Sequence, residues 1–172
     1  MMTDKLKITI PNTQAEFDAV RQLCWEYRDF LLTLGPEDAK VVRTFYSRDK
    51  YAQIMDSLEQ HHTPPNGGTK LACVDDRPVG CGMFHTLMPG TAEIKRVFVR
   101  DEARGLGVGR ALMDSLLDQC RSRGYSRIVM DTGASMAQAK KLYLSMGFQL
   151  RGPYQEVPEH ALQRMVFFEM EL

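Results

Sequence analysis

Hydrophobic positions at the start of the chain follow a strand spacing first and a helix spacing afterwards. Residues 6–10 alternate between apolar and polar, which predicts a short strand ending at Pro11. Apolar residues then recur about every 3.6 positions over 17–34, and Thr13 with Glu16 has capping-box spacing. The pattern predicts a long helix that stops at Gly35, followed by a weaker helix over 47–60.

Short apolar runs alternate with helix-like segments in the rest of the chain. Strands are predicted over 70–76, 79–87, 92–99, 127–131, 148–150 and 164–172, and helices over 109–123 and 135–146. A capping box of Ser135 and Gln138 opens the second helix, and a polar loop covers 152–163. The order β-α-α-β-β-β-α-β-α-β-β predicts an α/β fold with a mixed sheet, helices on both faces and one domain over 1–172.

Three glycines, Gly105, Gly107 and Gly109, lie between a predicted strand and a predicted helix. Glycine costs about 0.5–1 kcal/mol relative to alanine in a regular element, so it marks a left-handed turn or a close backbone approach. The first amides of a helix have no internal partners and lie at the positive end of its dipole. The pattern leaves two interpretations open: simple turn residues, or a site for a phosphate group.

Two other nucleotide-binding motifs fit these glycines poorly. A dinucleotide site would use Asp131, at the end of the next strand, to bind a ribose. However, the spacing G-x-G-x-G lacks the third glycine of G-x-G-x-x-G, and the chain after Asp131 is too short for a second nucleotide-binding half. A Walker A loop is excluded because no Gly-Lys-Ser or Gly-Lys-Thr follows.

Residues 93–150 resemble the GCN5-related N-acetyltransferase (GNAT) family. The run VFVRDEARGLGVGRAL matches the family's acyl-CoA signature, Arg/Gln-x-x-Gly-x-Gly/Ala, at Arg104, Gly107 and Gly109. The run AKKLYLSMGF matches a second signature, in which a helix carries a tyrosine, here Tyr143, shortly before Gly-Phe. Both signatures occur in order and at the family's spacing. The resemblance therefore implies the GNAT-like acyl-CoA N-acyltransferase fold and acetyl-CoA as co-substrate.

The resemblance also implies a use for each matched position. The end of the strand offers main-chain groups to the pantetheine arm, and the amides after it hold the pyrophosphate. The implied cofactor-binding residues are Val97, Phe98, Val99, Arg104, Gly105, Leu106, Gly107, Val108, Gly109 and Arg110. Tyr143 is the implied general acid and Glu93 the implied base. Met136 stands where many members carry an asparagine that contacts the pantetheine arm.

The residues alone leave other roles open for both Glu93 and Tyr143. An alkyl amine has a pKa of about 10.4, so presenting it uncharged at pH 7 calls for a base. Strand alternation puts Glu93 on the same face as Lys95, Val97 and Val99, unless a bulge intervenes. Glu93 could instead form a surface ion pair, leaving the proton to another acid, a water or a backbone carbonyl. Tyr143 could be an aromatic packed between helix and sheet.

The expected activity is direct transfer of an acetyl group to a primary amine in a ternary complex. No cysteine accompanies the motifs, which argues against an acyl-enzyme. The alternative is a non-catalytic acyl-CoA sensor. Residues that could shape an acceptor site are the aromatics of the first helix and the side chains of the last loop. These are Trp25, Tyr27, Phe30, Tyr154, Glu156 and Glu159.

Composition excludes several kinds of partner. Basic and acidic residues balance at 22 each, so no global charge favours nucleic acid. No apolar run approaches the ~20 residues of a membrane span, and no signal sequence is evident. Four separated cysteines predict reduced thiols in a cytoplasmic protein, and His61 with His62 predicts a solvated loop, so no metal site is expected. Pairing of two copies through the C-terminal strands, as a homodimer, is compatible with the resemblance.

Overall fold

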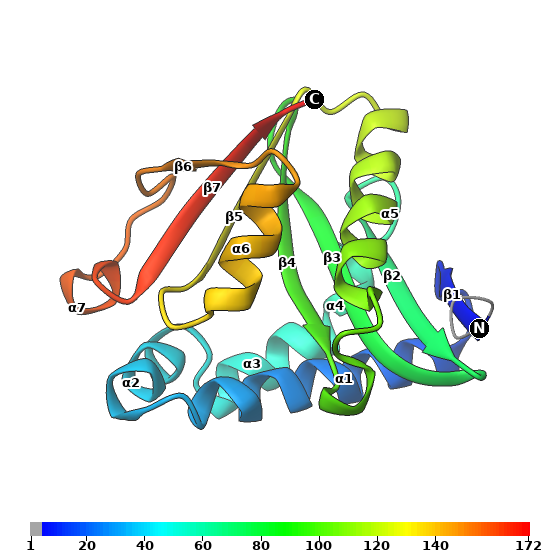
Figure 1. Cartoon of the computed structure of the whole chain (residues 1–172), viewed down its shortest axis with the longest axis horizontal. Coiled ribbons are helices and arrows are strands. Elements are labelled where there is room, and N and C mark those ends of the chain that lie inside the picture. Colours follow the sequence, from blue (N-terminus) through cyan, green and yellow to red (C-terminus); the bar gives the residue numbers. More distant parts are fainter. Residues whose placement is uncertain (1–4) are drawn as a thin grey trace.

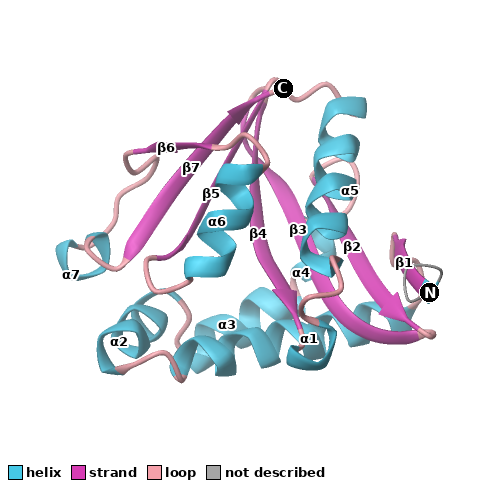
Figure 2. Ribbon diagram, in the orientation of Figure 1, coloured by secondary structure: helices cyan, strands magenta, loops and turns pink. Residues whose placement is uncertain are grey.

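The computed structural model describes residues 5–172, which form one seven-stranded sheet with helices on both faces (Figures 1 and 2). The strands are β1 (Leu6–Thr9), β2 (Gly67–Val74), β3 (Arg77–Met88), β4 (Thr91–Val99), β5 (Arg127–Gly133), β6 (Gln149–Arg151) and β7 (Met165–Glu171). The helices are α1 (Gln14–Leu32), α2 (Pro36–Phe45), α3 (Arg48–Asp56), α4 (Leu58–His61), α5 (Val108–Ser122), α6 (Ala137–Ser145) and α7 (Glu159–Leu162). The predicted α/β class and the mixed sheet are confirmed.

The sheet opens in its middle. Its strand order is β1-β2-β3-β4-β5-β7-β6, and every neighbouring pair is antiparallel except β4 with β5. That parallel pairing covers only residues 91–93 and 127–129. Beyond it the two strands diverge, as Figure 1 shows. Backbone groups at the carboxyl end of β4 are thereby left without a neighbour on the β5 side.

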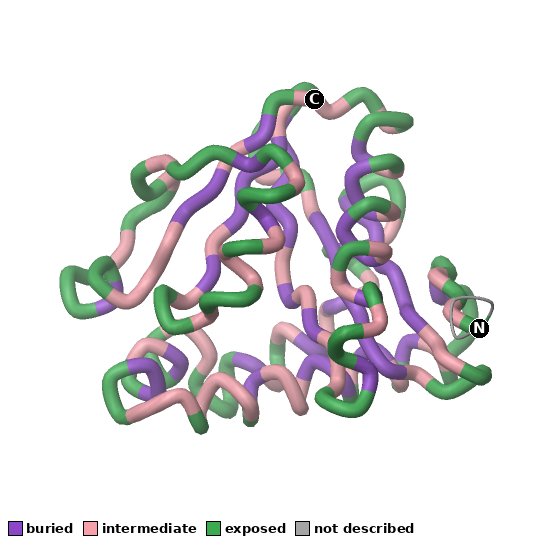
Figure 3. The backbone as a smooth tube through the Cα atoms, viewed as in Figure 1, coloured by how far each residue is buried: buried purple, intermediate pink, exposed green. Residues whose placement is uncertain are grey.

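Two hydrophobic clusters hold the helices on opposite faces of the sheet. α5 and α6 pack on one face through residues that include Leu116 and Phe168, both fully buried. α1, α3 and α4 pack on the other face through a second cluster that includes Leu23 and Met83. The central strands are accordingly the most buried part of the backbone (Figure 3). The core is thus built on both faces of β3 and β4, next to the gap between β4 and β5.

A bulge at Arg96 changes which way β4 side chains point. Three residues of β4 there span the same length as two of β3, and Arg96 has a φ of +53°. Such a backbone costs about 1–3 kcal/mol for a non-glycine residue. Glu93 and Lys95 share one face, whereas Val97 and Val99 lie against α5 on the other. The expectation that all four share a face is wrong, because the bulge shifts the alternation.

Several helix boundaries differ from those that the sequence pattern predicts. The capping box of Thr13 and Glu16 at the start of α1 is confirmed. Pro36 does not end the helical region but begins α2, a position where a missing N–H costs nothing. The helix expected over 47–60 is divided at Ser57 into α3 and α4, and α7 lies in the expected loop. Ser135 caps no helix, because α6 begins after Met136.

Candidate active site

The segment between β4 and α5 presents unpaired main-chain amides beside the gap in the sheet. Gly105 and Gly107 have φ values of +78° and +80°, which side chains rarely adopt, and no atom lies within 4 Å of a Cβ built on either. Gly107 is the N-cap of α5 without a side-chain cap, and Ala111 N–H donates to its carbonyl. The amides of 108–110 have no partner within residues 5–172. Unpaired amides at a helix N-terminus are a favourable place for an anion.

A cavity of about 470 Å³ lies against this segment and is called here the β4–α5 cavity. Its wall comprises the end of β4, the glycine segment, the start of α5, one face of α6 and part of α1. All the residues expected to bind the cofactor line it except Leu106, which packs against a small cluster around Leu112. The structure thus brings both predicted signature segments to one cavity.

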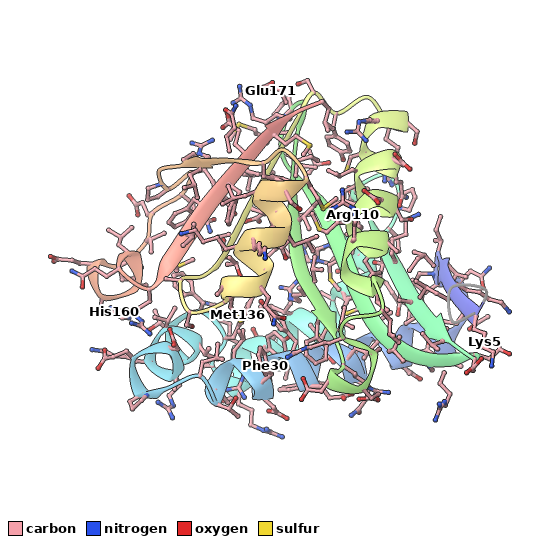
Figure 4. All side chains as sticks on the ribbon, viewed as in Figure 1. Lys5, Phe30, Arg110, Met136, His160 and Glu171 are labelled. Carbon is pink, nitrogen blue, oxygen red and sulfur yellow. The ribbon has the colours of Figure 1, made fainter. Side chains whose placement is uncertain are left out.

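Two arginines lie in the wall of this cavity. The Arg104 guanidinium stacks 4.8 Å above the centre of the Phe30 ring and forms a 2.8 Å ion pair with Asp101. Arg110 lies on α5 and its Nη1 is 3.5 Å from the Ser145 hydroxyl of α6 (Figure 4). Both cations stand beside the free amides. Together they add positive charge to a pocket that already favours an anion.

Tyr143 lies on the wall of the β4–α5 cavity. Its ring packs edge-on against Phe148 and Phe168, and only 5% of the residue is exposed. No hydrogen bond from its hydroxyl exists within residues 5–172. Burial, helped by the charge of Asp131, raises the pKa of Tyr143 above its usual value. The hydroxyl therefore keeps its proton at neutral pH.

Glu93 is buried, and it lines neither the β4–α5 cavity nor the second cavity described below. One carboxylate oxygen is 2.7 Å from His85 Nε2, and the other accepts a 2.5 Å hydrogen bond from the Tyr154 hydroxyl. The Lys95 ammonium lies 3.7 Å away. Burial alone would raise the pKa of Glu93, but His85, Lys95 and Tyr154 together lower it to about 2. Glu93 is a charged, fully bonded carboxylate.

Tyr154 connects Glu93 to a second carboxyl group, Asp131. Its hydroxyl lies 3.1 Å from Asp131 Oδ2. A phenol has one proton, and the shorter bond assigns it to Glu93, so Asp131 is held less tightly by this hydroxyl than Glu93 is. Burial raises the pKa of Asp131, so this carboxylate binds a proton more readily than an exposed one does. The sequence singled out Asp131 only for a dinucleotide site, which this position does not serve.

A second cavity, of about 360 Å³, lies under α1 and α2 and is called here the α1–α2 cavity. Apolar side chains of the two helices form much of it, and charged side chains from the helices, the sheet and the last loop complete its wall. The charged residues in its wall are Asp38, Lys50, Lys95, Arg96, Asp131, Glu156 and Arg164. Of these, the sequence analysis singled out only Glu156 as an acceptor-site candidate. The sequence did contain one signal for this cavity, because Lys95 and Arg96 are adjacent charged residues in an otherwise apolar strand.

The two cavities meet at Tyr27 of α1 and at Leu34, just after α1, which line both. Phe30 also lines the β4–α5 cavity, whereas Trp25 packs edge-on against Tyr51 in the core. The first helix therefore supplies both cavity wall and core.

Two other candidates lie away from the cavities. Glu159 begins α7 and lines neither of them. His62 is not a solvated loop residue, because it is buried and its Nδ1 lies 2.9 Å from the Phe84 carbonyl. His61 is exposed, as expected.

Within residues 5–172 no cluster of histidine, cysteine and acidic side chains has the arrangement of a metal site. The same residues include no helix long and apolar enough to cross a membrane.

Comparison with known proteins gives a consistent result. The model of the Acetyltransferase (GNAT) family matches residues 20–148. The chain is 34% identical to an uncharacterized N-acetyltransferase of Schizosaccharomyces pombe over 63% of its own length and 66% of that protein. It is 39% identical to an IAA acetyltransferase of Azospirillum brasilense over 70% of its own length and 84% of that protein. The chain thus spans slightly less than two thirds of the first relative and most of the second.

Solved structures share the fold at low sequence identity. A GNAT acetyltransferase from Staphylococcus aureus Mu50 superposes with a TM-score of 0.75 at 16% identity, over 96% of this chain and 98% of that one. The PaiA N-acetyltransferase of Thermoplasma acidophilum, solved in complex with coenzyme A, gives a TM-score of 0.70 at 12% identity. That match covers 97% of this chain and 99% of the other.

Proposed function

Because this chain belongs to the GNAT family of acyl-CoA-dependent N-acetyltransferases, we propose that it transfers an acetyl group from acetyl-CoA directly to a primary amine. The observation that carries this proposal is the meeting of two cavities at Tyr27 and Leu34. One cavity has the free amides that suit a diphosphate, and the other has the charged wall that suits a polar acceptor. This arrangement supports a ternary complex, in which both substrates are bound at once.

The residues of the β4–α5 cavity fit coenzyme A. A diphosphate would accept hydrogen bonds from the amides of 108–110, where Gly105 and Gly107 leave room for it. The unpaired end of β4 would bind the pantetheine arm through its main chain. Bound there, acetyl-CoA supplies an activated acetyl group.

Direct transfer is favoured over a covalent acyl-enzyme. The four cysteines, Cys24, Cys73, Cys81 and Cys120, lie within the described residues, and none lines either cavity. The amine nitrogen forms a bond to the acetyl carbon and the carbon–sulfur bond breaks. One proton leaves the amine for a base, and the released thiolate takes one from a general acid. Atoms and charges therefore balance without a protein thiol.

Tyr143 is proposed as the general acid. It lines the β4–α5 cavity, and its hydroxyl keeps its proton at neutral pH. A thiol of ordinary acidity has a pKa of about 8.5, so its thiolate needs only modest help in leaving. General acid catalysis of about 10²–10⁴-fold is the range such a donor supplies.

The base is proposed to be the cluster of Asp131, Tyr154 and Glu93, with Asp131 at its cavity end. A carboxyl group with a pKa of about 2, such as Glu93, holds a proton poorly. Burial raises the pKa of Asp131, which makes Asp131 the better proton acceptor. Glu93 would then act behind it by positioning the Tyr154 hydroxyl.

Binding and turnover, measured together, test the function. Titration calorimetry with coenzyme A and acetyl-CoA should show uptake of both, and a panel of amines should release free thiol from acetyl-CoA. An acetylated product identified by mass spectrometry completes the test. Uptake without turnover of any amine would favour the acyl-CoA sensor, and no uptake by folded protein would refute both functions.

A further inference from the structure

Arg96 lines the α1–α2 cavity as a buried cation without a carboxylate partner in residues 5–172. Only 6% of the residue is exposed. Its Nε has no hydrogen-bond partner at all, although it is buried. Buried guanidinium groups are normally paired, since an isolated charge is costly to remove from water. The missing partner is therefore a property of this site that calls for an explanation.

Each group in contact with Arg96 is neutral. Nη1 lies 3.3 Å from His62 Nε2 and 3.6 Å from Met83 Sδ, and the guanidinium stands 5.5 Å from the centre of the Tyr46 ring. His62 donates Nδ1–H to the Phe84 carbonyl, so its Nε2 has the lone pair that accepts from Arg96. Burial lowers the pKa of His62 to about 3, which keeps the imidazole uncharged.

Two nearby carboxylates, Glu93 and Asp38, already bond to other side chains. Glu93 is bonded to His85, Tyr154 and Lys95. Asp38 accepts two hydrogen bonds from Arg164, at 3.1 and 2.9 Å. Asp131 and Glu156 also line this cavity but form no ion pair with Arg96, so no carboxylate of the described residues is bonded to its guanidinium.

One nitrogen of the Arg96 guanidinium is left to bind a group in the cavity. Nη1 contacts His62 and Met83, Nε is buried without a partner, and Nη2 has no hydrogen bond within residues 5–172. A guanidinium N–H donates a charge-assisted hydrogen bond to a carboxylate oxygen, and such a ligand would also balance the buried charge. The bulge at residue 96, with its φ of +53°, turns this side chain to the cavity side of the sheet.

We propose that Arg96 binds the carboxylate of the acceptor, and that the acceptor is a small amino acid. This inference rests on the proposed transferase function and names its substrate class. Tyr27 lines both cavities, so an acceptor held between Arg96 and the cavity junction directs its amine toward Tyr143. Leu31, Phe45 and Ile54 line the same cavity and make part of its wall apolar, which suits an apolar side chain.

Matched acceptors that differ only in the carboxylate test the proposal. The common L-amino acids, their α-amides and the corresponding decarboxylated amines are each incubated with acetyl-CoA, and thiol release is followed. At least one amino acid should have a kcat/KM about 100-fold above that of its own amide, the ratio expected for a charge-assisted hydrogen bond. Equal or faster reaction of the amides would overturn the proposal and leave the transferase function standing.

Two arginine variants in the same cavity supply the control. Arg96→Met should remove the preference for the acid over the amide and leave acetyl-CoA affinity unchanged, and Arg96→Lys should restore part of it. Arg164→Met should change the reaction of acids and amides alike, because Arg164 already has Asp38 as its partner. A preference that survives Arg96→Met refutes the assignment.

A binding measurement keeps the inference testable if no amine is acetylated. With coenzyme A present, an amino acid should raise the Tm of the native protein more than its amide does, and Arg96→Met should abolish that difference. Absence of any such shift for every amino acid overturns the carboxylate site. Loss of turnover with this shift retained would instead refute only the catalytic function.

Discussion

The two cavities that meet at Tyr27 are built in different ways. The β4–α5 cavity presents the backbone of one segment, residues 97–110, whose glycines leave amides uncovered. The α1–α2 cavity gathers side chains from elements far apart in the chain, such as Asp38 and Arg164. Backbone amides neither titrate nor change with substitution, whereas side-chain charges do both. The first construction suits a cofactor shared by many enzymes, and the second suits an acceptor that differs among them.

The largest expected effect is on backbone recognition of the cofactor. Gly107→Ala should lower the affinity for coenzyme A at least about 100-fold, as two lost charge-assisted hydrogen bonds would. The new Cβ stands in the space where the diphosphate meets the amides. Calorimetric titration with coenzyme A measures the change in Kd.

Gly124→Ala is a closely matched control. Gly124 has a φ of +83°, against +80° for Gly107, and neither would place a Cβ within 4 Å of another atom. Each alanine should cost about 1–2 kcal/mol of unfolding free energy through its left-handed backbone. Only Gly107→Ala should weaken the binding of coenzyme A. Equal affinities in the two variants would show that the amides of α5 do not hold the diphosphate.

Lowering the pH should reduce the stability that Glu93 gives the folded protein. Its pKa in the folded protein, about 2, is below the ordinary 4.5, so its stabilisation is complete above pH 4.5 and is lost as pH falls towards 2. Glu93→Gln should therefore lower the free energy of unfolding by about 3 kcal/mol at pH 7. The difference from the native protein should shrink through pH 4 and 3. Urea denaturation across this pH series measures it.

Glu171 provides the surface comparison for that series. It pairs with Arg127 where β5 begins and β7 ends, an exposed position at which an ion pair contributes less than about 1 kcal/mol. Glu171→Gln should change stability little at any pH. Coenzyme A affinity should be the same in both variants, because main-chain donors hold the diphosphate. A pH-independent loss in Glu93→Gln would contradict the charged role of Glu93.

Tyr143→Phe should lower kcat by about 100-fold, within the range of general acid catalysis, and leave the Kd of acetyl-CoA unchanged. Phenylalanine preserves the packing against Phe148 and Phe168 and removes only the hydroxyl. Pre-steady-state thiol release separates the chemical step from product release. An unchanged kcat would mean that Tyr143 only packs between α6 and the sheet.

Tyr51→Phe tests whether loss of any buried hydroxyl has the same effect. Tyr51 is fully buried, donates to the Cys24 carbonyl at 2.6 Å and lines neither cavity. Its variant should lose about 1 kcal/mol of stability, as one buried hydrogen bond would, and keep its kcat. A similar fall in kcat for both variants would point to a general loss of packing.

Local patterns in the sequence predict the cofactor side well, because its parts are close together in the chain. The spacing of Arg104, Gly107 and Gly109 defines a strand, a turn and a helix N-terminus within a few residues. The order of most helices and strands along the chain and the capping box at Thr13 follow from equally local signals. The first helix ends before Gly35 as predicted, but α2 was missed, because a proline after a glycine is compatible with either the end or the beginning of a helix.

Long-range contacts explain what the sequence could not predict about the acceptor side. Tyr154 reaches Glu93 across 61 positions, and no periodicity shows that the loop after β6 folds back onto β4. The bulge at Arg96 is set by the register between β3 and β4, which a single strand does not encode. Both features depend on tertiary packing, so the partners of Glu93 and the direction of Arg96 emerge only with the fold.

The smallest expected effect concerns the contact that ties α2 to the rest of the acceptor side. Asp38 accepts from both Nε and Nη2 of Arg164 and from the Ser135 hydroxyl at 3.1 Å, so it joins α2 to β7 and to the loop before α6. Asp38→Asn keeps the size of the side chain but loses the charge. The KM for the amine should rise about tenfold, as one lost charge-assisted hydrogen bond implies.

Asp118 supplies the matched carboxylate for that prediction, since it pairs with Arg121 on the exposed face of α5 and touches neither cavity. Asp118→Asn should leave KM and the Kd of acetyl-CoA unchanged, whereas Asp38→Asn should change KM alone. If Asp38→Asn weakens the binding of acetyl-CoA as much as that of the amine, the two cavities are coupled through α6. This helix begins shortly after Ser135, which contacts Asp38, and it bears Tyr143. Separate effects would show that one half of the site can change its acceptor without disturbing the half that binds the cofactor.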